Sequence, residues 1–184
     1  AEIIPNNQIQ DILNMILYLK RDESLQGNKL LLWGSSLGGL YVLKLAALTK
    51  DIAGVYAQIT FANGLRNNTL GLEEEGIEKY IHQIENIKYK EIRENKKLLL
   101  PLKRLLSDEQ SKEFRENYKE VFPELIATKL SLSTIKHINE LSVDNNLASI
   151  QVPVLLGKAI KDKVNSPMEM NFIYEHLTAE KKLL

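Results

Sequence analysis

The sequence predicts an α/β fold with a parallel sheet and a helical insertion. Two observations carry this prediction. Short apolar runs that are typical of buried strands alternate with helical segments at both ends of the chain, whereas residues 65–145 are charged and helical with few strand signals. The composition, 44% hydrophobic and 26% charged, is that of an ordinary soluble globular protein, so the apolar runs can form a packed core.

Four segments in the first third of the chain follow this pattern. Apolar residues recur near a 3.6-residue period over Asn7–Lys20, which predicts an amphipathic helix with Pro5 shortly before it. Lys29–Trp33 is an apolar run too short for a helix and indicates a buried strand. Leu40–Lys50 is a helix that is apolar almost all round, so we expect it to be buried on more than one side. Ala53–Ala62 is β-branched and aromatic, which favours a second strand.

The charged middle of the chain predicts helices on a solvated surface. Helical spacing is clearest in one set of apolar residues: Ile77, Tyr80, Ile81, Ile84 and Ile87. Ser107 with Gln110 resembles a capping box that would start a later helix. The apolar segment "LLLPLKRLL", Leu98–Leu106, is open to three interpretations: an acyl-binding cleft wall, a lid, or a helix that packs on the core.

Strand character returns at Ile150–Gly157, and the last helix is expected over about Pro167–Leu177. Ser166 is a good N-cap for this helix, and Pro167 suits its first position. A further strand begins at about Lys182. The chain therefore divides into a first core part (residues 1–62), an insertion (residues 63–145) and a second core part (residues 146–184).

Composition excludes several classes of function. Lysine plus arginine equals aspartate plus glutamate, 24 against 24, so no net field favours nucleic acid as a partner. The absence of cysteine excludes disulfides, thiolate metal sites and cysteine nucleophiles. No run of eighteen apolar residues predicts a transmembrane segment, and no signal peptide is visible, which favours a cytoplasmic location.

The segment Gly34-Ser35-Ser36-Leu37-Gly38 follows an apolar strand directly and precedes an apolar helix. A nucleophile elbow has this context, because its serine occupies a strained turn whose neighbours must be small. Gly39 would let the helix pack closely against the sheet, and the N–H of Leu37 would help to hold an oxyanion. The alternative is a bland structural turn. A phosphate-binding loop is excluded, since Gly39 is not followed by the lysine that such a loop requires.

Three stretches of the sequence resemble the α/β-hydrolase family. "LLLWGSSLGG" resembles the nucleophile strand and elbow, "LASIQVPVLLG" the strand after the cap, and "KDKVNSPMEM" the loop that holds the acid. The resemblance implies a parallel-sheet hydrolase core, incomplete at both ends, with residues 63–145 as a helical cap. It also implies a triad with Ser36 as nucleophile and Asp162 as acid. The family usually places the acid about three residues after the strand's glycine. Here Gly157 and Asp162 are five apart, and Asp144 is the alternative acid.

The chain's three histidines do not complete this triad. His82 lies in the charged helical region, His137 precedes the acid, and His176 comes one strand too early for the family's base. A strand of about 5–6 residues and a loop would place the base beyond residue 184. Only one helix precedes Lys29, whereas the family has several strands there. We therefore expect this chain to be a piece of a longer hydrolase.

The leading functional hypothesis is a serine hydrolase that cleaves an ester or related acyl bond of a small molecule. Ser36 would attack, a histidine outside the chain would take its proton, and Asp162 would orient that histidine. No metal and no organic cofactor are implied. A non-catalytic binding or interaction protein of the same fold is one alternative. An acyltransferase or a thioesterase that uses the same elbow is another.

Overall fold

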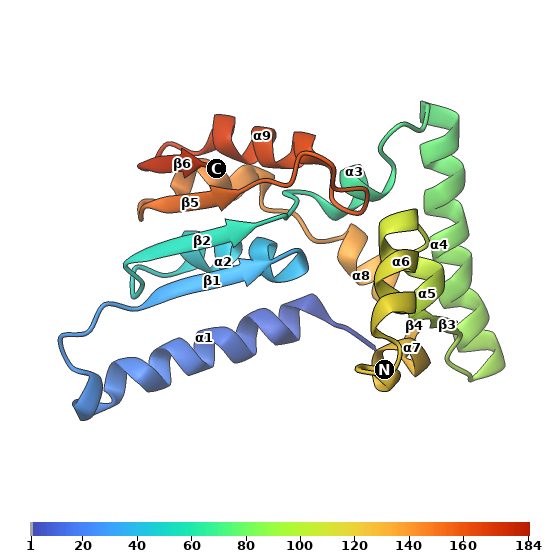
Figure 1. Cartoon of the computed structure of the whole chain (residues 1–184), viewed down its shortest axis with the longest axis horizontal. Helices are drawn as coiled ribbons and strands as arrows, with labels where there is room; N and C mark the ends of the chain where they lie inside the picture. Colours follow the sequence, from blue (N-terminus) through green and yellow to red (C-terminus); the bar gives the residue numbers. More distant parts are fainter. Residues whose placement is uncertain (1) are drawn as a thin grey trace. The chain divides into compact units, whose positions relative to one another are not determined.

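The structure is a computed structural model that describes residues 2–184, without the side chains of Leu125 and Ile126. Its contacts divide the chain into two units, which we describe separately (Figure 1). The sheet unit comprises residues 5–67 and 141–184. The helical unit comprises residues 2–4 and 68–140.

A four-stranded parallel sheet forms the centre of the sheet unit. Its order is β1-β2-β5-β6, made by Leu31–Ser35, Gly54–Gln58, Val154–Gly157 and Lys181–Leu183. The α/β fold class predicted from the sequence is thereby confirmed. β2 ends earlier than the predicted strand because the next residue, Ile59, has a φ of 41° and leaves the extended conformation that a ladder requires.

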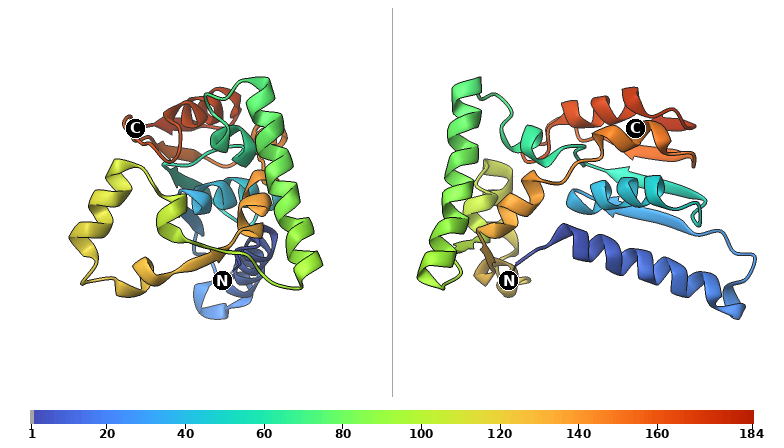
Figure 2. Two further views of the ribbon diagram at one scale, coloured as in Figure 1. Left: turned by 90° about the vertical axis from the view of Figure 1, so that its right-hand side faces the viewer. Right: turned by 180° about the vertical axis from the view of Figure 1, so that it is seen from behind.

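The helices of the sheet unit are α1 (Pro5–Arg21), α2 (Leu37–Leu48), α3 (Gly64–Asn68) and α9 (Pro167–His176), with 3₁₀ turns at Glu23–Leu25 (η1) and Asp144–Ser149 (η2). Both α2 and α9 contact η2 as well as the sheet, so they lie on the same face of it. α2 lies behind β1 and β2 in Figure 1 and in front of them in the rear view of Figure 2. The hydroxyl of Ser166 accepts the N–H of Met168, as its predicted N-cap role requires.

The prediction that the first strand is fully buried is wrong. Leu31 and Trp33 of β1 keep 69% and 66% of their surface exposed. Their side chains alternate with those facing α2, so they lie on the opposite face of the sheet. On that face a hollow of about 480 Å³ is present, and its described lining residues all belong to the strands and their flanking loops. An apolar run looks the same in sequence whether one face or both are covered.

The helical unit contains α4 (Glu74–Glu94), α5 (Leu102–Leu105), α6 (Glu109–Tyr118), α7 (Pro123–Ala127) and α8 (Ser133–Asn139). It also contains a short antiparallel pair, β3 (Leu99–Pro101) with β4 (Lys129–Ser131), in the region where the sequence predicts helices and shows few strand signals. Within residues 2–184, no helix is long and apolar enough to cross a bilayer.

Two details of the helical unit differ from the sequence-based expectation. The cap of α6 is Asp108, whose carboxylate accepts the N–H of Ser111, so the predicted capping box of Ser107 with Gln110 is wrong. Aspartate is as good an N-cap as serine, and here the helix starts one residue later. The segment Leu98–Leu106 is part strand and part helix, because Leu99, Leu100 and Pro101 pair with β4 and a short helix follows them.

An ion network around the buried carboxylate of Glu169 joins three segments of the sheet unit. The carboxylate of Glu169 on α9 is 5% exposed and accepts the N–H groups of Ala62 (2.8 Å) and Asn63 (3.2 Å). Arg66 bonds Glu169 through Nε (2.5 Å) and Nη2 (3.0 Å), and it bonds Asp144 at 2.9 and 3.1 Å. Burial opposes the charge of Arg66, but its bonds to both carboxylates outweigh this effect and raise its pKa.

Replacing this carboxylate should destabilise the fold. Glu169→Ala leaves the buried N–H of Ala62 without its acceptor and Arg66 without one of its two carboxylates, which should lower the free energy of unfolding by about 2–4 kcal/mol. Urea denaturation followed by circular dichroism measures this loss. The control is Glu175→Ala, an exposed glutamate on the same helix, which should change stability by less than about 0.5 kcal/mol. Equal effects of the two variants would contradict the role of the network.

Candidate functional site

Ser36 lies at the sharp junction between β1 and α2. Its φ of 53° and ψ of −123° place it in a conformation that costs a non-glycine residue about 1–3 kcal/mol. The hydroxyl makes no capping bond to its own helix, whereas the carbonyl accepts the N–H of Gly39 at 2.9 Å. The Leu37 N–H is the first of the helix, and no acceptor for it lies among the described residues. Ser36 and Leu37, the nucleophile and oxyanion donor predicted from the sequence, therefore lie together at the N-terminus of α2.

The three predicted glycines are under different steric constraints. A Cβ on Gly34 would collide with the carbonyl of Gly38, and a Cβ on Gly39 would lie 2.6 Å from the Cβ of Thr60. A Cβ on Gly38 would meet nothing within 4 Å. The close approaches that need glycine are thus made by Gly34 within the turn and by Gly39 where α2 packs against the segment after β2.

Asn165 is the residue that contacts the hydroxyl of Ser36. Its side chain is buried, and its Nδ2 donates both to Ser36 Oγ (3.0 Å) and to the carbonyl of Ile59 (2.9 Å). The bond to Ile59 fixes the orientation of the amide, so the second hydrogen points at the serine. One oxygen lone pair of Ser36 is therefore occupied, and its proton stays available to a base.

Residues 59–60, directly after β2, also fix the turn at Ser36. Thr60 donates its hydroxyl to the carbonyl of Ser36 at 2.6 Å, and the N–H of Ile59 donates to the carbonyl of Gly157 at 2.7 Å. Ile59, like Ser36, has a positive φ, which is rare for a β-branched residue. Two strained residues meet at the carboxyl edge of the sheet, and strain of this kind persists where the surroundings fix it.

The two candidate acids, Asp162 and Asp144, have different hydrogen-bond partners. Asp162 lies in the loop that leads to Asn165, and its Oδ1 accepts the N–H groups of Val164 (2.8 Å) and Asn165 (3.0 Å). It thereby shapes the loop that brings Asn165 to Ser36. Asp144 has both oxygens bound by Arg66, and one of them also accepts from Asn63. An acid that must orient a histidine needs a free oxygen, which favours Asp162 over Asp144.

None of the three histidines is bonded to Ser36 in the structure. His176 ends α9, about 15 Å along the helix from its start beside Asn165, and bonds the carbonyl of Phe172. His137, in the helical unit, lies 3.3 Å from a carboxylate oxygen of Glu2. His82 is exposed on α4. Among residues 2–184, no three metal-ligating side chains gather as they would around an ion.

Sequence reasoning missed Asn165, Thr60 and the partners of Glu169. The tripeptide Asn165-Ser166-Pro167 signals a helix start, which explains the cap but not the amide that reaches Ser36. Glu169 carried a weak signal, because it neighbours the apolar Met170 on the face of α9 that is now buried, and a charge there requires a partner.

No family model matches this chain. Two curated relatives from Escherichia coli, each an uncharacterized 31.7 kDa protein from the traX-finO intergenic region, are 28% and 27% identical to it over all 184 residues. The match covers 100% of this chain and 64% of each relative, so the chain spans a little less than two thirds of the relatives' length.

Solved structures show the same fold. The DcsB complex with its substrate analogue superposes with a TM-score of 0.77 at 19% identity, over 99% of this chain and 64% of that one. The α/β hydrolase GrgF from Penicillium gives 0.66 at 16% identity, over 100% and 64%. The monoacylglycerol lipase of Paleococcus ferrophilus gives 0.62 at 19% identity, over 100% and 66%. This chain therefore has the α/β-hydrolase fold, and the fold expected from the sequence resemblance is confirmed.

The steric constraint on the turn can be tested with a matched pair of glycines. Gly34→Ala forces the backbone carbonyl of Gly38 to move and should lower the free energy of unfolding by about 3 kcal/mol or more. Gly38→Ala should be neutral or stabilising by up to about 1 kcal/mol, because it adds a helix former in open space. Thermal and urea unfolding of both variants give the comparison. A tolerated Gly34→Ala would show that the turn is not under this constraint.

The amide of Asn165 should also contribute to stability. Asn165→Leu leaves the part-buried carbonyl of Ile59 without this donor, at an expected cost of about 1–3 kcal/mol. Asn171→Leu is the control, since this exposed asparagine on α9 bonds only the ammonium of Lys158 among the described residues. Hydrogen exchange at residues 59–60 should increase in the first variant alone. Unchanged exchange there would mean that Asn165 does not hold this segment.

Proposed function

We propose that the chain carries the nucleophile of a serine hydrolase that cleaves an ester or related acyl bond of a small molecule. The observation that carries the proposal is the geometry of Ser36. Its strained backbone turns the hydroxyl away from its own helix, and Asn165 holds the oxygen in place. A purely structural turn requires neither the strained backbone nor the bond from Asn165. A nucleophilic serine at the carboxyl edge of a parallel sheet needs both an exposed hydroxyl and a fixed oxygen position.

The proposed mechanism assigns a step to each group. The Oγ of Ser36 attacks the acyl carbon while a histidine base takes its proton, and the N–H of Leu37 donates to the developing oxyanion. The bond between the acyl carbon and the leaving oxygen then breaks. The histidine gives its proton to the departing alcohol, and the acyl group stays on Ser36. The remaining oxygen of Asp162 orients the base. We assign the base to a histidine outside these 184 residues, because the chain spans only 64% of its curated relatives and His176 lies at the distant end of α9.

The acyl-enzyme that this step forms has two fates. Transfer of the acyl group to water makes the protein an esterase, or a thioesterase where the substrate is a thioester. Transfer to an alcohol or an amine makes it an acyltransferase. The first step is identical in each case, so the geometry at Ser36 supports all three activities, and hydrolysis is the simplest of them.

Covalent labelling tests the proposal. In the protein as its gene encodes it, a fluorophosphonate that reacts with activated serines should modify Ser36, and Ser36→Ala should reduce turnover of a p-nitrophenyl ester by at least about 10³-fold. Peptide mass spectrometry locates the label. The 184 residues alone should turn over slowly, since the base would be absent.

Ser35→Ala is the matched control. Ser35 is the last residue of β1 and directly precedes the nucleophile, so its loss should leave both labelling and turnover within about twofold of the unmodified protein. Turnover retained in Ser36→Ala would refute the assignment. A protein that is folded but neither labelled nor active would instead favour the non-catalytic binding protein.

A further inference from the structure

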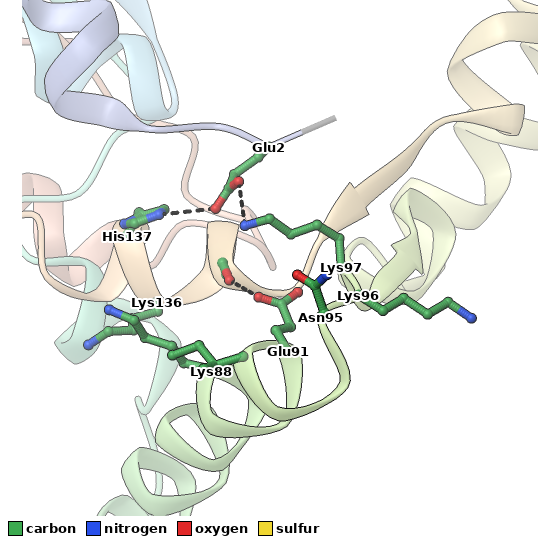
Figure 3. Close-up of a pocket in the computed structure, with 10 residues that line it drawn as sticks. Glu2, Lys88, Glu91, Asn95, Lys96, Lys97, Lys136 and His137 are labelled. Atoms are coloured by element: carbon green, nitrogen blue, oxygen red, sulfur yellow. Dashed lines mark hydrogen bonds and ion pairs between the residues drawn. The ribbon is translucent and has the colours of Figure 1, made fainter.

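A second cavity lies within the helical unit. It has a volume of about 390 Å³ and is lined by the end of α4, by α8 and by Glu2 (Figure 3). This volume lies within the range of small-ligand sites. Four lysines and two glutamates contribute the charged groups of its wall, so its lining carries a net positive charge even with a neutral His137.

The first glutamate of the wall, Glu91, is fully engaged. Its side chain is buried, its Oε1 accepts from the N–H of Leu98 (2.7 Å) and from the hydroxyl of Ser131 (3.3 Å), and its Oε2 accepts from Ser133. Burial opposes the charge, but these donors outweigh it and keep the pKa of Glu91 below its usual value. The carboxylate thus holds α4 to α8, and both of its oxygens already accept hydrogen bonds.

The second glutamate, Glu2, is neutralised by its neighbours. It lies 2.9 Å from the ammonium of Lys97 and 3.3 Å from Nε2 of His137. The hydrogen bond from Lys97 outweighs burial and lowers the pKa of Glu2, so the pair stays charged at neutral pH. Figure 3 shows these three side chains together on one side of the cavity.

Among the described residues, the three other lysines of the wall, Lys88, Lys96 and Lys136, are not balanced in this way. Lys88 has no ion pair or side-chain hydrogen bond among the described residues, and Lys136 pairs only with Glu140, whose side chain is 56% exposed. Surface pairs of this kind contribute little, so an incoming anion can compete with Glu140. In Figure 3 the side chains of Lys88, from α4, and Lys136, from α8, extend toward the same side of the cavity.

We propose that this cavity binds a small organic anion whose phosphate or carboxylate group is held by Lys88 and Lys136. Two ammonium groups on one wall repel each other, and an oxyanion between them replaces this repulsion with two charge-assisted hydrogen bonds. The aliphatic stems of the lysines and the side chain of Ile92, 68% exposed, offer contact to an organic body. The site is independent of the elbow, so it stands whether or not Ser36 is a nucleophile.

Histidine resonances provide a direct test, because the chain has only three histidines and one of them, His137, lines the cavity. The whole chain is titrated at 150 mM salt with phenyl phosphate, benzoate and benzyl alcohol, which share a ring and differ in the head group. His137→Gln assigns the reporting signal. Saturable shifts of His137, but not of His82 or His176, are expected with one or both anions and not with the neutral alcohol. Tighter phenyl phosphate indicates a phosphorylated ligand, and tighter benzoate a carboxylate.

Two double variants make the test specific. Lys88→Gln with Lys136→Gln should raise the dissociation constant at least about tenfold, since both head-group contacts are lost. Lys79→Gln with Lys90→Gln removes the same charge from α4 at positions outside the cavity and should leave affinity within about twofold. Equal weakening by both pairs would mean nonspecific attraction and would overturn the proposal. So would an absence of saturable binding, or equal binding of benzyl alcohol.

Discussion

Burial of the Glu169 carboxylate is the constraint on which the sheet unit depends. A charge in that position is tolerable only where donors surround it, and here the backbone of residues 62–63 and the guanidinium of Arg66 supply them. Arg66 extends the network to Asp144, which precedes β5. The segment after β2, the segment before β5 and the first turn of α9 are therefore fixed to one another. These are the segments that border the carboxyl edge of the sheet.

The conformation of Ser36 depends on the segments that the Glu169 network holds together. Its strain is maintained because Thr60 holds its carbonyl and Asn165 holds its hydroxyl, and neither residue belongs to β1 or α2. Thr60 is placed by the close approach of Gly39 and by its N–H bond to the sulfur of Met170, beside Glu169 in α9. The elbow is thus a local sequence motif whose geometry depends on distant residues, Thr60 at 24 positions from Ser36 and Asn165 at 129.

This division explains what the sequence could predict. The strand, turn and helix around Ser36 and the cap at Ser166 are local patterns, and their positions were correct to within a few residues. The bonds of Asn165 and Glu169 join segments that are distant in sequence, and no periodicity reveals them. β3 and β4 have three residues each, too few to show an alternating pattern. Leu31 and Trp33 are apolar and exposed, which composition alone does not distinguish from burial.

The two candidate sites, Ser36 and the lysine-lined cavity, depend on different physical interactions. At Ser36 the decisive features are backbone angles and partly buried hydrogen bonds, which depend on packing and respond little to salt. In the helical unit the decisive feature is an excess of lysine ammonium groups over carboxylates that are already engaged. Such a site tolerates small shifts of the backbone but loses affinity as ionic strength rises. Salt dependence therefore separates the two sites, because an anion bound at Lys88 and Lys136 is displaced under conditions that leave the geometry of Ser36 intact.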